Sequence, residues 1–266
     1  MTHRLQTFLT LLLLLSFSAC MTVPVSGRKA FNLIPEGIET SLGEQSFSSV
    51  LSKERESNDP RLNAIVTRVG QRIAAVSGRS DYNWEFKVID SKEQNAFCLP
   101  GGKIAVYKGI LSVAKNEAGL ATVMSHEVVH AIARHGGQRI SANLALVGGM
   151  VALENTALKN NPNGSYIMAA LGLGTQVGLL LPYSRSHETE ADEIGQVLMA
   201  QAGYDPAESI RFWQRFSEAT KGQSVPTFLS THPSSQGRAE NLREKLPAAL
   251  QEYQRAPNQY SLGESI

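Results

Sequence analysis

Hydrophobic residues recur at helical spacing along most of the chain, and they alternate with polar residues in only one short stretch. Leu62, Ile65 and Val69, for example, follow the spacing of one helix face, with Asp59 as the expected N-cap and Pro60 as the first helical residue. Similar patterns predict helices over residues 36–51, 60–78, 116–141, 184–202, 206–219 and 238–246. The chain is therefore expected to be mainly helical.

The alternating stretch predicts a small sheet. Residues 84–90 alternate between apolar and polar and predict a strand, and residues 103–107 predict a second one. The turn-forming residues between them, 95–102, predict a loop. The predicted fold class is therefore α+β, mainly helical, with the sheet beside helix 116–141. An extended peptide could add as a strand at the outer edge of such a sheet, although the sequence leaves open which strand forms that edge.

The N-terminus has the layout of a secretory signal. A short basic head precedes an apolar run that is too short to span a membrane, and small residues lead to Cys20. The ending is similar to that of a bacterial lipoprotein signal, which predicts a signal over residues 1–20, a lipid on Cys20 and attachment to a membrane surface. Met21 in place of an aspartate is typical of an outer-membrane address. Ordinary secretion with cleavage nearby is the alternative.

The rest of the chain is expected to form one domain over residues 36–250, after a tether over 21–35 and before a disordered polar tail over 251–266. The net charge of +1 implies no nucleic-acid partner. Cys98, between Phe97 and Leu99, is expected to be a buried small hydrophobe, and no disulfide framework is expected.

Residues 142–181 are rich in alanine, glycine and leucine and are broken by a strong turn signal at 160–164. The second half, Tyr166 to Leu181, is apolar but slightly short for a membrane span. We expect a helix that packs against helix 116–141 or rests on the membrane surface, rather than a transmembrane helix.

The most informative motif is His126-Glu127-Val-Val-His130, inside the predicted helix 116–141. Residues four apart share one helix face, so His126 and His130 can bind one Zn²⁺ at about 2.0–2.1 Å. Glu127 can then act as general base toward a zinc-bound water. His135 lies five residues beyond His130, roughly 140° off the ligand face, and is not expected to be a ligand.

A third ligand is expected in the predicted helix 184–202. Four carboxylates compete for the role: Glu188, Glu190, Asp192 and Glu193. Glu188 and Asp192 share a face that the small residues Ala191 and Gly195 border, whereas Glu190 points nearly opposite. We therefore predict Glu188 as the ligand and Asp192 as a hydrogen-bond partner of a ligand histidine. His187 is predicted to be a neighbour of the site, not a ligand.

Two histidines and one glutamate leave one coordination position for water, which is typical of a catalytic zinc site. One Zn²⁺ per chain and peptide-bond hydrolysis are therefore expected, with Glu127 passing the proton of the water to the leaving amine. Polypeptide substrates, bound as extended strands, are the expected partners.

These motifs resemble those of the HtpX-like and CAAX-protease-like zinc metallopeptidases, in particular their soluble, lipoprotein-type members. The resemblance covers roughly residues 36–248 and includes residues 95–103 and Thr231-His232-Pro233. It implies a zincin-like (gluzincin) domain, Glu188 as ligand in an E-x-x-x-D motif, and quality control of misfolded or unassembled envelope proteins. The expected location is the periplasmic face of the outer membrane. Some members carry a repeat array after this domain, and no partner bound through such repeats is expected here.

Two later residues leave alternatives open. His232 precedes a proline, which favours an extended backbone. The resemblance suggests a fourth, inhibitory zinc ligand at His232, which could instead donate to the oxyanion or lie at the domain rim. Arg238 either orients a loop or a substrate carbonyl, or lies at the surface. The competing functions are a chaperone or assembly lipoprotein with a mostly closed zinc site, and a structural zinc protein.

Overall fold

The computed structural model describes residues 20–24, 26–155, 183–220, 227–232 and 237–266 of the chain. Its contacts divide the chain into two units, one with Gly37–His135 and Pro182–Ile266, and the other with Met1–Glu36 and Gly136–Leu181. Of the predicted signal over 1–20, all residues but Cys20 lie outside the described residues, as does the segment Tyr166–Leu181. No helix in the described ranges is long and apolar enough to cross a membrane.

The larger unit contains a three-stranded sheet in the order β3 (Glu85–Ile89), β5 (Lys103–Tyr107), β4 (Ala96–Leu99). β3 pairs parallel with β5 and β4 pairs antiparallel with β5. The loop predicted over 95–102 is therefore wrong for Ala96–Leu99, because pairing with the fully buried β5 supplies the hydrogen bonds of these residues. Within the described part of the chain, β4 has a neighbouring strand on one side only.

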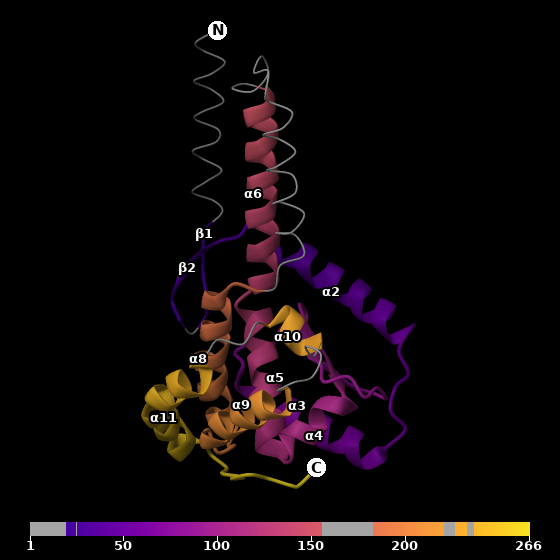
Figure 1. Ribbon diagram of the computed structural model, residues 1–266, viewed down its shortest axis with the longest axis vertical. Coiled ribbons are helices and arrows are strands. Elements are labelled where there is room, and N and C mark those ends of the chain that lie inside the picture. Colours follow the sequence, from indigo (N-terminus) through magenta and orange to yellow (C-terminus); the bar gives the residue numbers. More distant parts are fainter. Residues whose placement is uncertain (1–19, 25, 156–182, 221–226, 233–236) are drawn as a thin grey trace. The chain divides into compact units, whose positions relative to one another are not determined.

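Helices make up most of the larger unit, and the helix that begins at Pro60 starts where its local signal predicts. The Asp59 carboxylate accepts from the backbone N–H of Arg61 and Leu62 at 3.0 and 3.1 Å, which confirms the predicted cap. The helices outside the metal-binding region are α2 (Glu36–Leu51), α3 (Pro60–Val76), α4 (Lys108–Ala114), α9 (Ala207–Thr220), α10 (Thr227–Thr231) and α11 (Arg238–Arg255). Of these, α3, α4 and α9 contact α5 (Glu117–Ile132), every residue of which is buried (Figure 1).

The helix predicted over 116–141 is two helices in the structure. α5 ends at Ile132 and α6 begins at His135 and continues to Asn155. Between them, Arg134 has a φ of +57°, a left-handed conformation that is uncommon for a residue with a side chain. Its guanidinium contacts the buried Glu39 carboxylate twice, each time at 3.0 Å, and this pair stabilises the break.

The C-terminal predictions also need correction. α11 runs to Arg255 with Pro247 inside it, not to Leu246, because Leu242 and Ala249 on either side of the proline are both buried. The tail beyond α11 is ordered. The N–H groups of Glu117 and Ala118, which have no partner within α5, donate to the carbonyls of Glu264 and Leu262 at 3.0 Å each.

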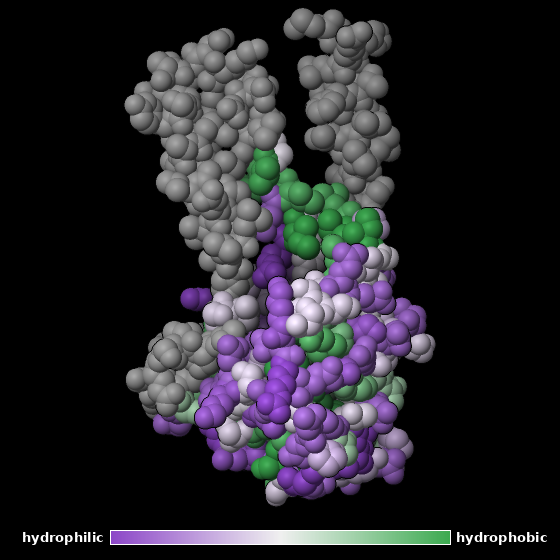
Figure 2. All heavy atoms as spheres, turned by 90° about the vertical axis from the view of Figure 1, so that its right-hand side faces the viewer, coloured by the Kyte–Doolittle hydropathy of each residue, from purple (hydrophilic) through white to green (hydrophobic). Residues whose placement is uncertain are grey.

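In the smaller unit, residues predicted as a tether form two short strands. β1 (Cys20–Thr22) pairs antiparallel with β2 (Lys29–Phe31). Just beyond β2, Leu33 N–H donates to the Ser141 hydroxyl of α6 at 2.7 Å. Figure 2 shows that most of the coloured face is hydrophilic, with hydrophobic side chains gathered in patches. Large hydrophobic residues exposed on α6 are Ile140, Leu144, Leu146 and Val147.

Cys98 on β4 is a buried free cysteine, as predicted. Burial raises the pKa of its thiol well above the usual value, and the nearby Glu127 carboxylate adds to the effect. We expect Cys98 to resist iodoacetamide in the native protein at neutral pH and to react fully in guanidinium, because the thiolate is the nucleophile. Mass spectrometry of the Cys98 peptide measures this. Stoichiometric labelling of the native protein would contradict the buried placement.

Candidate metal centre

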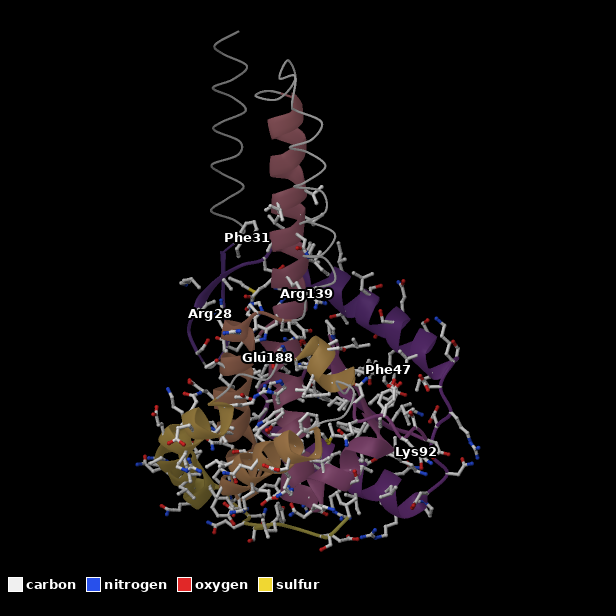
Figure 3. The ribbon with its side chains drawn as sticks, in the orientation of Figure 1. Arg28, Phe31, Phe47, Lys92, Arg139 and Glu188 are labelled. Carbon is white, nitrogen blue, oxygen red and sulfur yellow. The ribbon has the colours of Figure 1, made fainter. Side chains whose placement is uncertain are left out.

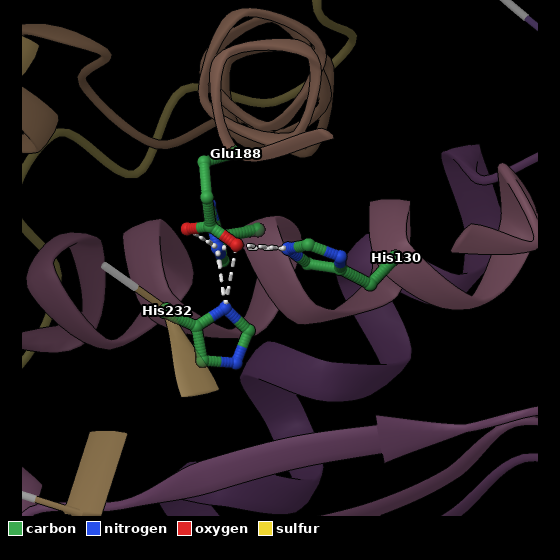
Figure 4. A group of neighbouring side chains, drawn as sticks. His130, Glu188 and His232 are labelled. Carbon is green, nitrogen blue, oxygen red and sulfur yellow. Dashed lines mark hydrogen bonds and ion pairs between the residues drawn. The ribbon is translucent and has the colours of Figure 1, made fainter. Parts of the chain in front are cut away.

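Two consecutive turns of α5 present His126 and His130 to the same point, as the four-residue spacing requires. Both side chains are buried, and their Nε2 atoms lie 3.1 Å apart. Glu188, in the first turn of α8 (Arg185–Gln201), meets them there. Its Oε2 is 3.5 Å from His126 Nε2 and its Oε1 is 3.4 Å from His130 Nε2. Figure 3 places Glu188 in the interior, and Figure 4 shows His130 and Glu188 facing each other.

His232 adds a fourth donor atom to this group. Its Nδ1 lies 3.4 Å from His126 Nε2 and 3.1 Å from Glu188 Oε1. All four donor atoms lie within 4.8 Å of one another. Tetrahedral ligands at about 2.0–2.1 Å from a zinc ion stand about 3.3–3.4 Å apart. The separations and the donor chemistry, three imidazoles and a carboxylate, therefore fit zinc.

Small residues let α8 approach α5 closely enough for this meeting. Ala191 is fully buried, and a Cβ added to Gly195 would lie 3.1 Å from the backbone nitrogen of His126. The Ser184 hydroxyl accepts from His187 N–H and caps α8, so Glu188 lies in the first turn. The small-residue face that the sequence indicated is thus the contact face of the two helices.

Asp192 and Arg238 support the donor group from behind. Asp192 Oδ1 lies 2.9 Å from His126 Nδ1, the ring nitrogen that faces away from the other donors. Arg238 donates from Nε to Asp192 and from Nη2 to Glu188 Oε2, the latter at 2.8 Å. The surface alternative for Arg238 is wrong, since the residue is buried and its guanidinium lies 3.7 Å over the Trp213 ring. No spacing rule connects Arg238 with the metal motif.

The protonation equilibria of the group reflect burial and close carboxylates. Burial opposes the charged form of His126, but Asp192 and Glu188 outweigh it and raise the pKa to about 9. Burial lowers the pKa of His130 well below its usual value. For Glu188, hydrogen bonds from the imidazoles overcome burial and hold the pKa below the ordinary carboxylate range. Metal uptake therefore competes with a proton on His126.

Glu127 lies beside the donor atoms without being one of them. The side chain is buried, and its Oε1 accepts no hydrogen bond among the described residues, although His232 Nε2 is 3.4 Å away. Burial raises the pKa of Glu127, and the charges of His232 and His126 oppose the rise. A buried carboxylate oxygen with unused accepting capacity fits a group that handles a proton of a small reactant.

His232 does not lie at the rim of the domain, and the stretch before it is not extended. α10 precedes it, and His232 N–H donates to the Phe228 carbonyl at 2.8 Å to close the last helical turn. The side chain is 3% exposed, and its ring stacks on Phe228 with centroids 4.4 Å apart. The rim alternative is therefore wrong, and the two functional alternatives remain.

The comparison with known proteins identifies the family. Residues 60–246 match peptidase family M48. The chain belongs to peptidase family M48. Its enzymatic class is that of a metallopeptidase, and its cofactor is zinc, in agreement with the four donor atoms described above. The predicted fold class, a mainly helical zincin-like domain with a small sheet, is confirmed.

Similar proteins include mitochondrial enzymes and a bacterial one. The mitochondrial metalloendopeptidase OMA1 of Schizosaccharomyces pombe is 40% identical over 85% of this chain and 66% of its own length. OMA1 of Homo sapiens is 30% identical over 84% of this chain and 44% of its own length. The beta-barrel assembly-enhancing protease of Escherichia coli K12 is 26% identical over 84% of this chain and 47% of its own length. The narrower placement among HtpX-like, lipoprotein-type members stays a prediction.

Proposed function

We propose that this M48 protein is a zinc metalloendopeptidase that hydrolyses peptide bonds in misfolded or unassembled proteins of a cell envelope. The observation that carries the proposal is the convergence of His126, His130 and Glu188 beside a buried Glu127 whose Oε1 accepts no hydrogen bond among the described residues. Three protein ligands with a fourth position for water are typical of catalytic zinc, so in this proposal the His232 Nδ1 atom that lies at the fourth position gives way to water.

Each residue has a role in this proposal. Zinc, when bound, polarises the scissile carbonyl and lowers the pKa of water. His126, His130 and Glu188 hold the ion, and Asp192 orients His126 through its Nδ1. Glu127 accepts a proton from the attacking water and delivers it to the leaving amine.

The proposed substrate is an unfolded or extended polypeptide that pairs with β4. Three points support it: β4 has a strand on one side only among the described residues, its Cys98 lies near enough to Glu127 to feel the carboxylate charge, and peptides commonly bind by adding a strand to a free edge. The bacterial relative is named a beta-barrel assembly-enhancing protease, which supports an envelope substrate. The OMA1 relatives are named as mitochondrial, which supports a different compartment.

The proposed location rests on the sequence. The apolar run before Cys20 and the residue Met21 support a lipid-anchored protein on the periplasmic face of an outer membrane. Radiolabelled palmitate incorporation, lost in a Cys20→Ser variant, is the corresponding test.

A second candidate function is a chaperone or assembly role with a rarely active zinc site. The observation that favours it is the fourth donor atom, His232 Nδ1, which occupies the remaining corner of the group. In the enzymatic proposal, the same residue either regulates the site by leaving it or donates to the oxyanion through Nε2.

The proposed function is tested by metal analysis together with a casein cleavage assay. We expect about one zinc per chain, loss of cleavage with 1,10-phenanthroline and recovery when zinc is added back, because the three ligands hold the ion reversibly. Circular dichroism is the control, since a structural zinc protein would unfold on chelation. Cleavage that persists in zinc-depleted protein would contradict the proposal.

A further inference from the structure

His135 lies against the side of His130 that faces away from the metal-binding group. The two Nδ1 atoms are 3.0 Å apart, and the rings meet at 79°. In one continuous helix, His135 would lie roughly 140° around the axis from His130. The break at Ala133 and Arg134 turns the chain, so that His135, the first residue of α6, returns to the ligand face.

The outer nitrogen of His135 contacts a carboxylate of α8. His135 Nε2 lies 3.0 Å from Glu190 Oε2. The His135 side chain is 0% exposed and the Glu190 side chain is 9% exposed, so bulk water does not replace either contact. Glu190 is the carboxylate that the sequence placed opposite Glu188. It is connected to the metal-binding group through the imidazole of His135, which contacts His130.

When His130 Nε2 binds metal, the contacts permit one consistent placement of protons. His130 Nε2 faces the other donor atoms, 3.4 Å from Glu188 Oε1, so a neutral His130 that binds metal carries its proton on Nδ1. That proton is donated to His135 Nδ1, which must then be an acceptor. The proton of a neutral His135 is consequently on Nε2 and is donated to Glu190. Each contact has one donor and one acceptor.

The two ligand histidines are thus oriented by two carboxylates of α8, one directly and one through another histidine. Asp192 accepts directly from His126 Nδ1, at 2.9 Å. Glu190, two residues earlier on α8, acts on His130 only through His135. A hydrogen bond to the outer nitrogen of a ligand imidazole fixes its tautomer and ring orientation, and the loss of such partners commonly weakens metal binding 10–100-fold, as an order of magnitude.

We propose that His135 and Glu190 form a hydrogen-bonded relay that fixes the tautomer and orientation of His130 and thereby sets the zinc affinity of the site. The relay rests on the proposed function, because it treats His130 Nε2 as a metal ligand. His135 and Glu190 are positioning residues, since neither touches the reacting atoms. The Arg134–Glu39 pair supports the relay, because it stabilises the helix break that places His135 beside His130.

The test compares two near-isosteric replacements, His135→Leu and His135→Asn. Leucine removes the acceptor for His130 Nδ1–H, whereas the asparagine carbonyl can replace it. We expect the zinc dissociation constant, measured by competition with a chromophoric chelator, to rise about 10–100-fold in His135→Leu and to stay within about threefold of wild type in His135→Asn. The visible spectrum of the Co²⁺-substituted protein should change in the leucine variant alone.

Substitution of Glu190, the outer residue of the relay, gives a second and independent test. Glu190→Leu leaves His135 in place but removes the acceptor for its Nε2–H, and we expect about a tenfold rise in the zinc dissociation constant. Glu193→Leu is the matched control on α8, because Glu193 pairs with Lys245 at 3.2 Å and is 31% exposed. Its zinc affinity should equal that of wild type. This test also decides the question where His135→Leu does not fold.

A metal-free measurement separates this inference from the proposed function. ¹⁵N spectra of the histidine rings in zinc-free protein should show His130 protonated on Nδ1 and His135 on Nε2. Wild-type protein with this pattern that takes up no zinc would overturn the proposed function while the relay stands. Unchanged tautomers in Glu190→Leu, with unchanged zinc affinity and Co²⁺ spectrum in both leucine variants, would overturn the relay.

Discussion

A Glu127→Gln variant should bind zinc as tightly as wild type and cleave casein about 10²–10⁴-fold more slowly, because the amide cannot accept a proton from water. The substitution is nearly isosteric, and Glu127 makes no hydrogen bond through Oε1 that the change would break in the described structure. His126, His130 and Glu188 keep their donor atoms. Steady-state cleavage rates and zinc content, measured on the same preparation, test the expectation.

Glu193→Gln is the control for the loss of one carboxylate charge, since Glu193 is partly exposed and pairs with Lys245 outside the donor group. It should leave both cleavage and zinc content unchanged. A Glu127→Gln protein that cleaves at the wild-type rate would remove Glu127 from the chemistry. A cellular phenotype that survives Glu127→Gln, despite lost cleavage, would instead favour the chaperone or assembly role.

The part of the site that follows from local spacing was predictable from the sequence. A four-residue interval on a helix places His126 and His130 on one face, and the same interval places Glu188 and Asp192 on one face of another helix. The structure brings these four side chains together, with His126 Nδ1 2.9 Å from Asp192. The bounds of α2 and the start of α3 were also predicted correctly, and for α3 this is because its Asp59 cap and hydrophobic face act within a few residues.

The features that were not predicted from the sequence depend on contacts between residues far apart in the chain. Arg238 is placed by Asp192 and Glu188, 46 and 50 residues away, and no local pattern encodes that. The break before His135 depends on Glu39, 95 residues from Arg134. The sequence predicts a loop over 95–102 because residues 100–102 form a turn, and only pairing with β5 makes Ala96–Leu99 a strand.

A second large effect, on stability, is expected from Glu117 at the N-terminal end of α5, where the ordered tail packs. Glu117, in the first turn of α5, is 2% exposed and accepts from Arg68 Nε at 2.9 Å, Arg72 Nη1 at 3.1 Å and the Tyr204 hydroxyl at 3.0 Å. Arg68 also donates to Glu264 of the tail at 2.9 Å. The buried Glu117 carboxylate of α5 therefore binds α3 and Tyr204, which lies between α8 and α9. Through Arg68 it is also connected to the tail.

Glu117→Gln should lower the free energy of unfolding by about 3 kcal/mol, because it removes the charge that two arginines share in a buried setting. The arginine side chains are 37% and 25% exposed, so water recovers part of the loss and keeps the effect at the lower end of the range for broken buried pairs. At about 2–4 °C per kcal/mol, the thermal midpoint should fall by about 6–12 °C.

Glu240→Gln is the matched control for this prediction. Glu240 also lies in the first turn of a helix, α11, so both changes remove the same favourable interaction with the helix N-terminus. It is 64% exposed and pairs only across the surface with Arg243, so its loss should change stability by less than about 0.5 kcal/mol. The difference between the two midpoints then measures the buried network alone, because the helix-terminal contribution cancels. Equal midpoints would mean that Arg68, Arg72 and Tyr204 gain nothing from the Glu117 charge, and that the tail is held on α5 by its backbone hydrogen bonds.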